Sequence, residues 1–128
     1  KYLKTNSPHD TIQEVDWVSG AAMMIRTDCL ADVGNFDEDF FMYCEDVDIC
    51  KRAKDKGWQV FYYPHLAFTH IIGGIIKHTS PLAVIRHHRS MWHYYKKHLA
   101  VHILWDSVIF TAIFIRAIFL ICVGWITK

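Results

Sequence analysis

Apolar positions recur at α-helical spacing after Glu45. One face of the helix they indicate carries Asp46, Ile49, Cys50 and Ala53. Gly57 follows, and glycine commonly ends a helix in the left-handed conformation. We predict a helix from Glu45 to about Lys56, with the Asp46 carboxylate at the rim of its apolar contact surface.

Short segments with strand character lie on both sides of this helix. Strand patterns cover Val15 to Ile25, Trp58 to Tyr63 and Leu66 to His70, and a short helix is predicted from about Asp28 to Val33. Strands and helices that alternate in this way predict an α/β layer arrangement. The small residues at 19–22 interrupt the first strand, and they either form a bulge or allow close approach of a backbone or ligand.

The end of the chain has a different pattern, because its apolar positions are nearly continuous. The run from Ser107 to Thr127 is close to the ~20 residues that cross a bilayer, although Arg116 lies near its middle. A helical projection places His102, Asp106 and Arg116 on one side and Phe114, Ile115 and Ile118 on the other. We predict a membrane-associated helix from about Leu99 to Thr127, and a buried helix of a soluble domain is the alternative.

Composition supports this division of the chain. The 128 residues allow one domain, and a net charge of +1 suggests neither nucleic acid nor a strongly acidic partner. Four cysteines without paired spacing predict buried thiols in a reducing compartment. The chain opens on a polar, turn-rich stretch without methionine, so we expect a fragment: residues 1–98 of a soluble domain and 99–128 as the hydrophobic helix.

Acidic residues are concentrated where the first helix begins. Glu45, Asp46 and Asp48 occupy its first turn, and Asp48 with Arg52 forms an i,i+4 pair worth only ~0.2–0.5 kcal/mol. One interpretation is that the helix dipole favours acids at this end. The other is that these acids perform chemistry.

The order of the flanking segments favours the second interpretation. The strand DWVSGAAMMIR begins at Asp16, the block GNFDEDFFMYCEDVDICKR contains the acids, and FTH ends at His70. Together these segments resemble the C-terminal half of the catalytic domain in inverting, GT-A-type glycosyltransferases of family two, particularly rhamnosyltransferase-like members. The resemblance covers about residues 15 to 75, and it implies the C-terminal portion of a GT-A fold, followed here by the hydrophobic helix.

The resemblance implies roles for individual residues. Asp46 would be the general base that takes a proton from the acceptor hydroxyl, and Glu45 would position the acceptor. Asp16 and Trp17, together with Gly20 and Ala21, would border the donor and acceptor pocket. His70 would complete a site for Mg²⁺ or Mn²⁺, whose Asp-x-Asp motif lies N-terminal to these residues in the family.

The same resemblance implies partners and a location. The donor would be a nucleotide-diphosphate sugar, with rhamnose the suggested sugar, and the acceptor a glycan or lipid-linked saccharide in cell-envelope polysaccharide synthesis. Basic residues precede the hydrophobic helix at Arg86, Arg89, Lys96 and Lys97, so the positive-inside tendency places the domain at the cytoplasmic face of the membrane.

Two other classes of function stay open. A basic, aromatic and histidine-rich stretch at 86–98, which we expect to be helical, ends near the i,i+4 pair of His98 and His102. This suggests a His-rich, membrane-anchored metal-binding module, although lipid-headgroup contact or a solvated helix face explains the basic residues equally well. The second class is a non-catalytic scaffold or subunit that keeps the transferase fold.

Overall fold

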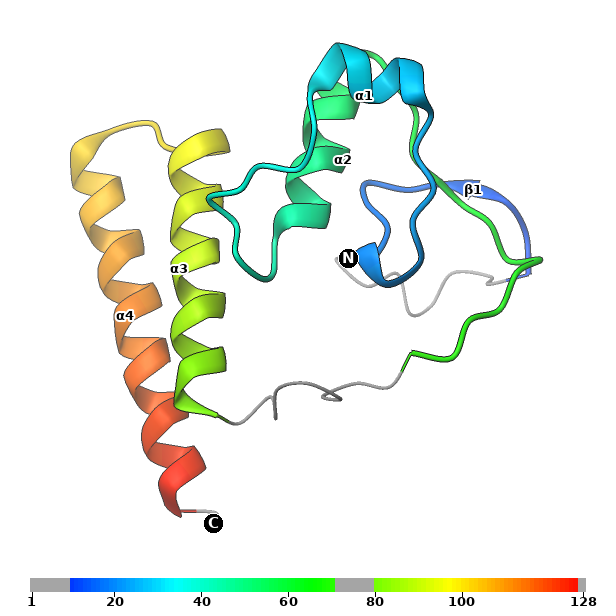
Figure 1. Cartoon of the computed structure of the whole chain (residues 1–128). Helices are drawn as coiled ribbons and strands as arrows, with labels where there is room; N and C mark the ends of the chain where they lie inside the picture. Colours follow the sequence, from blue (N-terminus) through cyan, green and yellow to red (C-terminus); the bar gives the residue numbers. More distant parts are fainter. Residues whose placement is uncertain (1–9, 71–79, 127–128) are drawn as a thin grey trace.

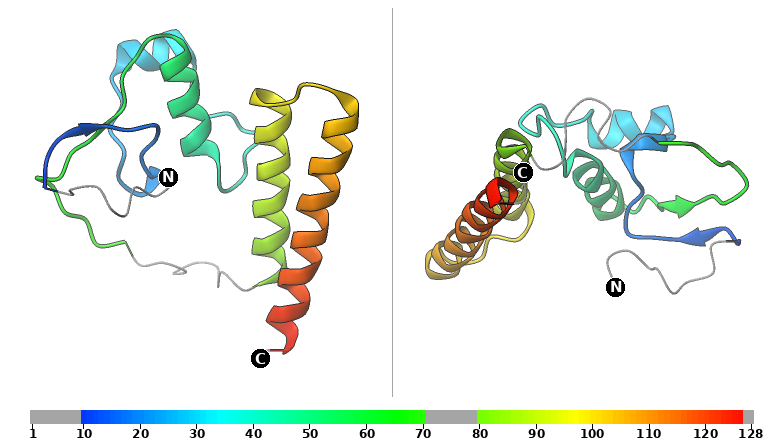
Figure 2. Two further views of the ribbon diagram at one scale, coloured as in Figure 1. Left: turned by 180° about the vertical axis from the view of Figure 1, so that it is seen from behind. Right: turned by 90° about the horizontal axis from the view of Figure 1, so that it is seen from below.

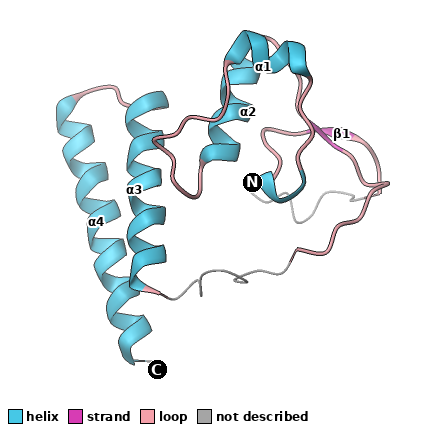
Figure 3. Ribbon diagram, in the orientation of Figure 1, coloured by secondary structure: helices cyan, strands magenta, loops and turns pink. Residues whose placement is uncertain are grey.

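A computed structural model describes residues 10–70 and 80–126 of the chain (Figure 1). Figure 3 shows that helices predominate in these residues. The elements in order are β1 (Gln13–Glu14), the 3₁₀ turn η1 (Gly20–Ala22), α1 (Thr27–Val33), α2 (Glu45–Asp55), β2 (Phe61–Tyr62), α3 (Pro81–His98) and α4 (Ile103–Ile126). The α/β expectation is therefore met only in part, by helices with one two-stranded sheet.

Both helices predicted before residue 60 are confirmed, and glycines end them as expected. Gly34 has φ +82° and donates its N–H to the Leu30 carbonyl at 2.9 Å, which ends α1. Gly57 has φ +87° and donates to Lys54 at 2.9 Å just after α2. These ends depend on local backbone chemistry, so the sequence alone was sufficient to predict them.

The face of α2 that the sequence identified packs against α1 and the loop before it. Ile49, Cys50 and Ala53 are buried there, together with Cys29 of α1 and Phe40 of the loop. Asp46 lies half-buried at the edge of this apolar surface, as predicted. This small core fixes the first turn of α2, which carries the acids.

The chain enters α2 through a sharp turn. Tyr43 and Cys44 both have positive φ, 69° and 67°, although neither is glycine. Residues other than glycine rarely adopt a positive φ because their Cβ atom crowds the backbone. The turn brings the loop at 36–44 back toward α3 and aims the first turn of α2 at the segment around Gly20 (Figure 1).

The predicted strands are mostly wrong. Among the described residues, only Gln13 and Glu14 pair, antiparallel, with Tyr62 and Phe61, and one further backbone bond joins Val15 N–H to the Val60 carbonyl at 2.9 Å. The remainder of 15–25 is irregular apart from η1, and 66–70 contains no strand. β-branched and aromatic residues favour a strand only where a neighbouring backbone is available to pair, and the described residues offer these segments no such neighbour.

Helices α3 and α4 form an antiparallel hairpin whose two helices lie side by side in all the views (Figures 1 and 2). Ser80 caps α3 by accepting the Ala83 N–H at 3.1 Å, and Pro81 occupies the first turn. Trp92 and Phe110 meet edge to face with ring centroids 5.1 Å apart. The helical expectation for 86–98 is confirmed, and α3 begins five residues earlier at Pro81.

The two sides predicted for the hydrophobic helix are present in α4. Asp106 accepts hydrogen bonds from Tyr95 and Lys96 of α3 at 2.9 and 2.6 Å, and Arg116 contacts His88 at 2.8 Å. The side chains predicted to lie opposite, Phe114, Ile115 and Ile118, are exposed. His102 precedes the helix and accepts the Leu104 N–H, so it does not share the polar side. By length and composition, 103–124 is suited to crossing a membrane, with a mean hydropathy of 2.4.

The prediction that the cysteines are free thiols is confirmed, and the prediction that they are buried is confirmed in part. All four cysteines are free. Cys29 and Cys50 are buried and Cys44 is half-buried, whereas Cys122 is exposed on α4. Burial raises the pKa of the Cys44 thiol to about 11, so it stays protonated at neutral pH.

Candidate active site

Asp46 is held against the segment around Gly20. Its Oδ2 accepts the Gly20 N–H at 2.9 Å, and its Oδ1 accepts the Val47 N–H at 2.8 Å. A Cβ atom on Gly20 would lie 3.5 Å from the Asp46 Cβ, in van der Waals contact. The space beside Gly20 would thus admit a Cβ atom, and it is the two backbone donors that fix the orientation of the carboxylate.

Glu45 lies beside Asp46 in a different environment. Its side chain is half-buried, and Oε2 is buried without a hydrogen-bond partner among the described residues. Burial, with the charge of Asp46 nearby, raises the pKa of Glu45 above its ordinary value. The helix therefore begins with two carboxyl groups in contrasting surroundings, an arrangement that suits separate roles in acid–base chemistry.

A large pocket of about 1050 Å³ lies next to this turn. Four of the residues expected at the site line it, namely Asp16, Trp17, Ala21 and His70. Its wall also includes the exposed apolar side chains of Met24, Phe61, Tyr63, Leu66 and Phe68. A concave, mostly apolar surface with a few polar groups is typical of small-molecule sites.

The remaining expected residues lie behind the pocket wall. Asp46, Glu45 and Gly20 do not line the pocket, but Ser19 and Ala21, the neighbours of Gly20, do. Asp46 therefore contacts the backbone of Gly20, which lies between two residues of the pocket wall. The exposed Asp16 carboxylate, which lines the pocket, pairs with Lys54 of α2 at 2.8 Å.

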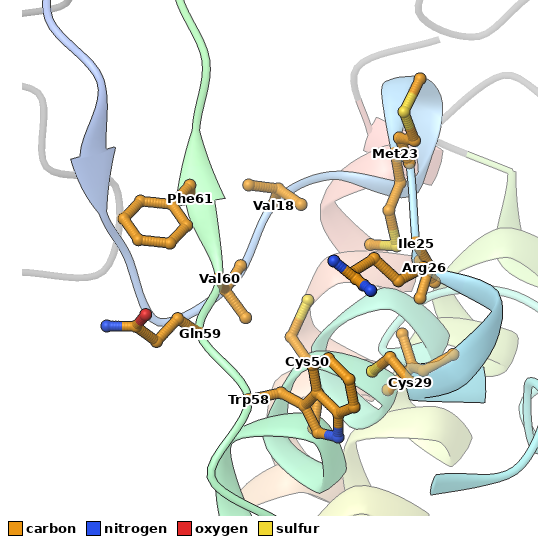
Figure 4. Close-up of a pocket in the computed structure, with 13 residues that line it drawn as sticks. Val18, Met23, Ile25, Arg26, Cys29, Cys50, Trp58, Gln59, Val60 and Phe61 are labelled. Carbon is orange, nitrogen blue, oxygen red and sulfur yellow. The ribbon is translucent and has the colours of Figure 1, made fainter. Parts of the chain in front are cut away.

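A second, smaller cavity of about 150 Å³ separates α1 and α2 from the chain at 58–61 (Figure 4). Cys29, Cys50, Ile25, Val60 and the Trp58 ring lie around it. Burial raises the pKa of both cysteine thiols. The volume is below that of typical ligand sites, and protonated thiols are poor nucleophiles, so we interpret this cavity as part of the core.

Asp48 differs most from expectation, because it is fully buried at 0% exposure. Its carboxylate accepts from Arg52 Nε at 2.8 Å and lies 2.9 Å from Lys97 Nζ and 2.7 Å from His98 Nε2. We name these four residues the Asp48 cluster. It joins α2 to the end of α3, so the interpretation of Asp48 and Arg52 as a weak surface pair is wrong.

Hydrogen bonding decides the charge of the buried Asp48 carboxyl. Burial alone would raise its pKa, but the hydrogen bonds from Lys97, His98 and Arg52 hold the pKa below its ordinary value. Arg52 also donates to the carbonyls of Val33 and Asn35, which ties α2 to the end of α1. Nothing in the sequence pattern indicates this cluster beyond the basic residues in the last turn of α3.

The histidine-rich stretch does not form the expected histidine pair. His98 ends α3 and bonds Asp48, whereas His102 lies ahead of α4, so the two are not one turn apart on a helix. Lys96 and Lys97 are also bound to acids, which contradicts a freely solvated helix face.

Another group of possible metal ligands occurs in the described part of the chain. Asp37, Asp39 and His93 bring one ligand atom each to within 4.8 Å of one another. However, Lys97 Nζ lies 2.5 Å from Asp37 Oδ2, and its hydrogen bond lowers the pKa of Asp37 to about 2. Because an ammonium group already neutralises this carboxylate, we interpret the group as an ion-pair cluster.

Comparison with known proteins identifies the class of the chain. Residues 6–100 match the family model described as "Glycosyltransferase like family 2", and the chain belongs to this family. Membership implies the GT-A type of nucleotide-sugar transferase fold. No solved structure matches the chain.

Within this family the chain is rhamnosyltransferase-like. It is 39% identical to Rhamnosyltransferase WbbL of Escherichia coli over 64 residues, which cover 48% of this chain and 24% of that protein. It is 33% identical over 78 residues to the N-acetylglucosaminyl-diphospho-decaprenol L-rhamnosyltransferase of Mycobacterium tuberculosis, covering 61% of this chain and 25% of that protein. The chain therefore spans about a quarter of the length of these curated relatives.

Proposed function

We propose that the intact protein transfers a sugar, with rhamnose the first candidate, from a nucleotide-diphosphate donor to a lipid-linked or glycan acceptor with inversion. The reaction would serve cell-envelope polysaccharide synthesis at the cytoplasmic face of the membrane. The observation that carries the proposal is the Asp46 carboxylate, which two backbone N–H groups hold against the wall of a large pocket. The family and the names of its relatives supply the sugar and the acceptor class.

Asp46 is the general base in this proposal. It takes the proton of the acceptor hydroxyl while the acceptor oxygen bonds the anomeric carbon, and the bond from that carbon to the diphosphate breaks on the opposite face. The two backbone hydrogen bonds fix the direction of the carboxylate, and its oxygens retain lone pairs for the incoming hydroxyl. Attack opposite the leaving group inverts the anomeric configuration.

The neighbouring residues bind and position the reactants. Glu45, with its raised pKa and a buried oxygen that has no hydrogen-bond partner within 10–70 and 80–126, is suited to hydrogen-bond an acceptor hydroxyl. Asp16 and Trp17 lie on the pocket wall, where a sugar or base can stack and hydrogen-bond. Ala21 lines the pocket, and Gly20 beside it donates its backbone N–H to Asp46.

His70 is the proposed protein ligand of a divalent metal ion, Mg²⁺ or Mn²⁺. Its exposed imidazole lines the pocket together with Asp16, which fits one ligand of such a site. The group of Asp37, Asp39 and His93 does not line this pocket. A bound divalent ion neutralises charge on the departing diphosphate. With His70→Ala in the intact enzyme, we expect activity to need a higher metal concentration, and an unchanged metal dependence would make His70 structural.

A panel of donors tests the proposed function. The intact protein is incubated with labelled nucleotide-diphosphate sugars, including rhamnose, glucose and N-acetylglucosamine donors, and with a polyprenyl-diphosphate-linked saccharide. We expect transfer of one sugar, most efficiently rhamnose, to the lipid-linked acceptor. Donor binding without transfer to any acceptor would instead support the non-catalytic scaffold.

A further inference from the structure

We propose that the α3–α4 hairpin lies in the plane of the membrane and that α4 does not cross it. In this arrangement α4 lies among the outer acyl chains and α3 lies above it at the level of the headgroups. The inference deepens the proposed function, on which it rests for the presence of a membrane, by specifying how the enzyme meets its lipid-linked acceptor.

The exposed surface of α4 identifies the surrounding medium. Large apolar side chains cover it from end to end, among them Leu104, Trp105, Val108, Ile115 and Phe119. The most apolar window of the helix is 0% buried within the protein. An apolar surface of this length is stable in hydrocarbon, whereas in water it would cause association.

The register of the hairpin argues against a membrane-crossing α4. His88 lies opposite Arg116, Trp92 opposite Phe110 and Lys96 opposite Asp106, so α3 runs beside most of α4. The exposed Arg89 is therefore level with the middle of α4. If α4 crossed a bilayer, α3 would carry this guanidinium to the centre of the hydrocarbon, where charges are rare and costly.

The other side of α3 gives an independent reason. The loop at 36–44 and the start of α2 cover it along its length: Arg86 stacks on Phe41 at 4.3 Å, Ser90 donates to the Met42 carbonyl at 2.7 Å, and Lys97 bonds Asp37 and Asp48. Figure 2 shows the end-on view, with α3 between α4 and α2. A crossing α4 would place these ion pairs in the bilayer as well.

The in-plane arrangement avoids both conflicts. Packed helices are ~8–10 Å apart, and interfacial helices enter ~5–10 Å into the headgroup–acyl boundary, so α4 can be immersed while α3 stays among the headgroups. The exposed Arg89 of α3 places a positive charge at the level of the headgroups, which complements anionic lipid. A lipid surface therefore matches both the apolar face of α4 and the positive charge beside it on α3.

The test measures the depth of three labels on one side of α4. Leu104, Ile115 and Cys122 are exposed, and Leu104 and Cys122 are five full turns apart, with Ile115 within about 20° of the same side. A spin label is attached to native Cys122, or to Leu104→Cys or Ile115→Cys in a Cys122→Ser background, with Cys44→Ser throughout. The intact protein is placed in vesicles of phosphatidylethanolamine and phosphatidylglycerol, and label depth is obtained from relaxation by oxygen and by a polar nickel complex.

We expect all three labels to lie at similar depth in the acyl region, with a control label at Arg89→Cys at headgroup depth. A label at position 115 deeper than those at 104 and 122 by on the order of 10 Å would show a crossing helix and overturn the inference. Labels shielded from both relaxants would show that a protein covers α4, which also overturns it. Sugar transfer measured on the same variants tests the proposed function separately, because label depth does not require turnover.

Discussion

The part of the chain from β1 to His70 and the α3–α4 hairpin both expose large apolar side chains, but in different settings. In the first part, Met24, Leu66 and Phe68 surround a pocket that also contains Asp16 and His70. In the hairpin, the apolar side chains form one uninterrupted surface, and the polar groups of α4 face α3. A mixed, concave surface suits a small polar substrate, whereas a continuous apolar one suits lipid.

Ion pairs join the two parts beside the buried ring of Phe40, which contacts His93 of α3 edge to face. Lys97 lies within 2.9 Å of both Asp37 and Asp48, and His98 adds a second contact to Asp48. Asp48 lies only two residues beyond Asp46 in α2. We therefore assign Asp46 to the chemistry at the pocket and Asp48 to the attachment of the hairpin. Substitutions at the two positions test these roles separately.

The largest expected effect follows Asp46→Asn. The amide cannot accept the acceptor proton, so turnover should fall by about 10²–10⁴-fold while donor affinity changes little. Steady-state kinetics and donor titration measure the two quantities. Asp28→Asn, which changes an exposed acid outside the pocket, is the matched control and should retain activity.

Asp48→Asn should chiefly reduce stability. It leaves Lys97, His98 and Arg52 without their buried anion, and removing one partner of a buried pair costs about 3–5 kcal/mol. Denaturant unfolding measures the loss. Asp55→Asn interrupts the exposed pair with Lys51 and should cost less than about 1 kcal/mol. Equal stability of the two variants would refute a role for the cluster in attachment.

A smaller effect is expected inside the hairpin. His88 donates from Nδ1 to the Val84 carbonyl at 2.7 Å, so its Nε2 is free to accept from Arg116. A double-mutant cycle with His88→Leu and Arg116→Leu should give a coupling free energy of about 1.5–3 kcal/mol. Additive losses would mean that the two side chains do not interact.

The smallest expected effect is a pH dependence of stability. The Lys97 hydrogen bond lowers the pKa of Asp37 to about 2, against about 3.9 in an unfolded chain. Its contribution to stability is therefore complete above the unfolded value and is lost as the pH falls through the folded value. Melting temperatures between pH 5 and 2 should fall less in Asp37→Asn than in the unchanged protein, whereas Asp39→Asn should resemble the latter.

The sequence predicted the features that depend on neighbouring residues. The helix that begins at Glu45, its buried face and the glycine ends at Gly34 and Gly57 are local in origin. The block around Asp46, together with the flanking segments that begin at Asp16 and end at His70, indicated the family. The strands were overpredicted because pairing needs a second backbone. The Asp48 cluster was missed because Lys97 and His98 are about fifty residues away, and periodicity carries no information about such contacts.

The stereochemistry of the transfer reaction tests the central claim most directly. The intact protein is supplied with a donor of known anomeric configuration and a lipid-linked acceptor, and the configuration of the new glycosidic bond is determined by nuclear magnetic resonance. A single displacement assisted by Asp46 predicts complete inversion in the unchanged enzyme and product formation about 10²–10⁴-fold slower with Asp46→Asn. A retained configuration, or an inverted product formed at an undiminished rate by Asp46→Asn, would contradict the account.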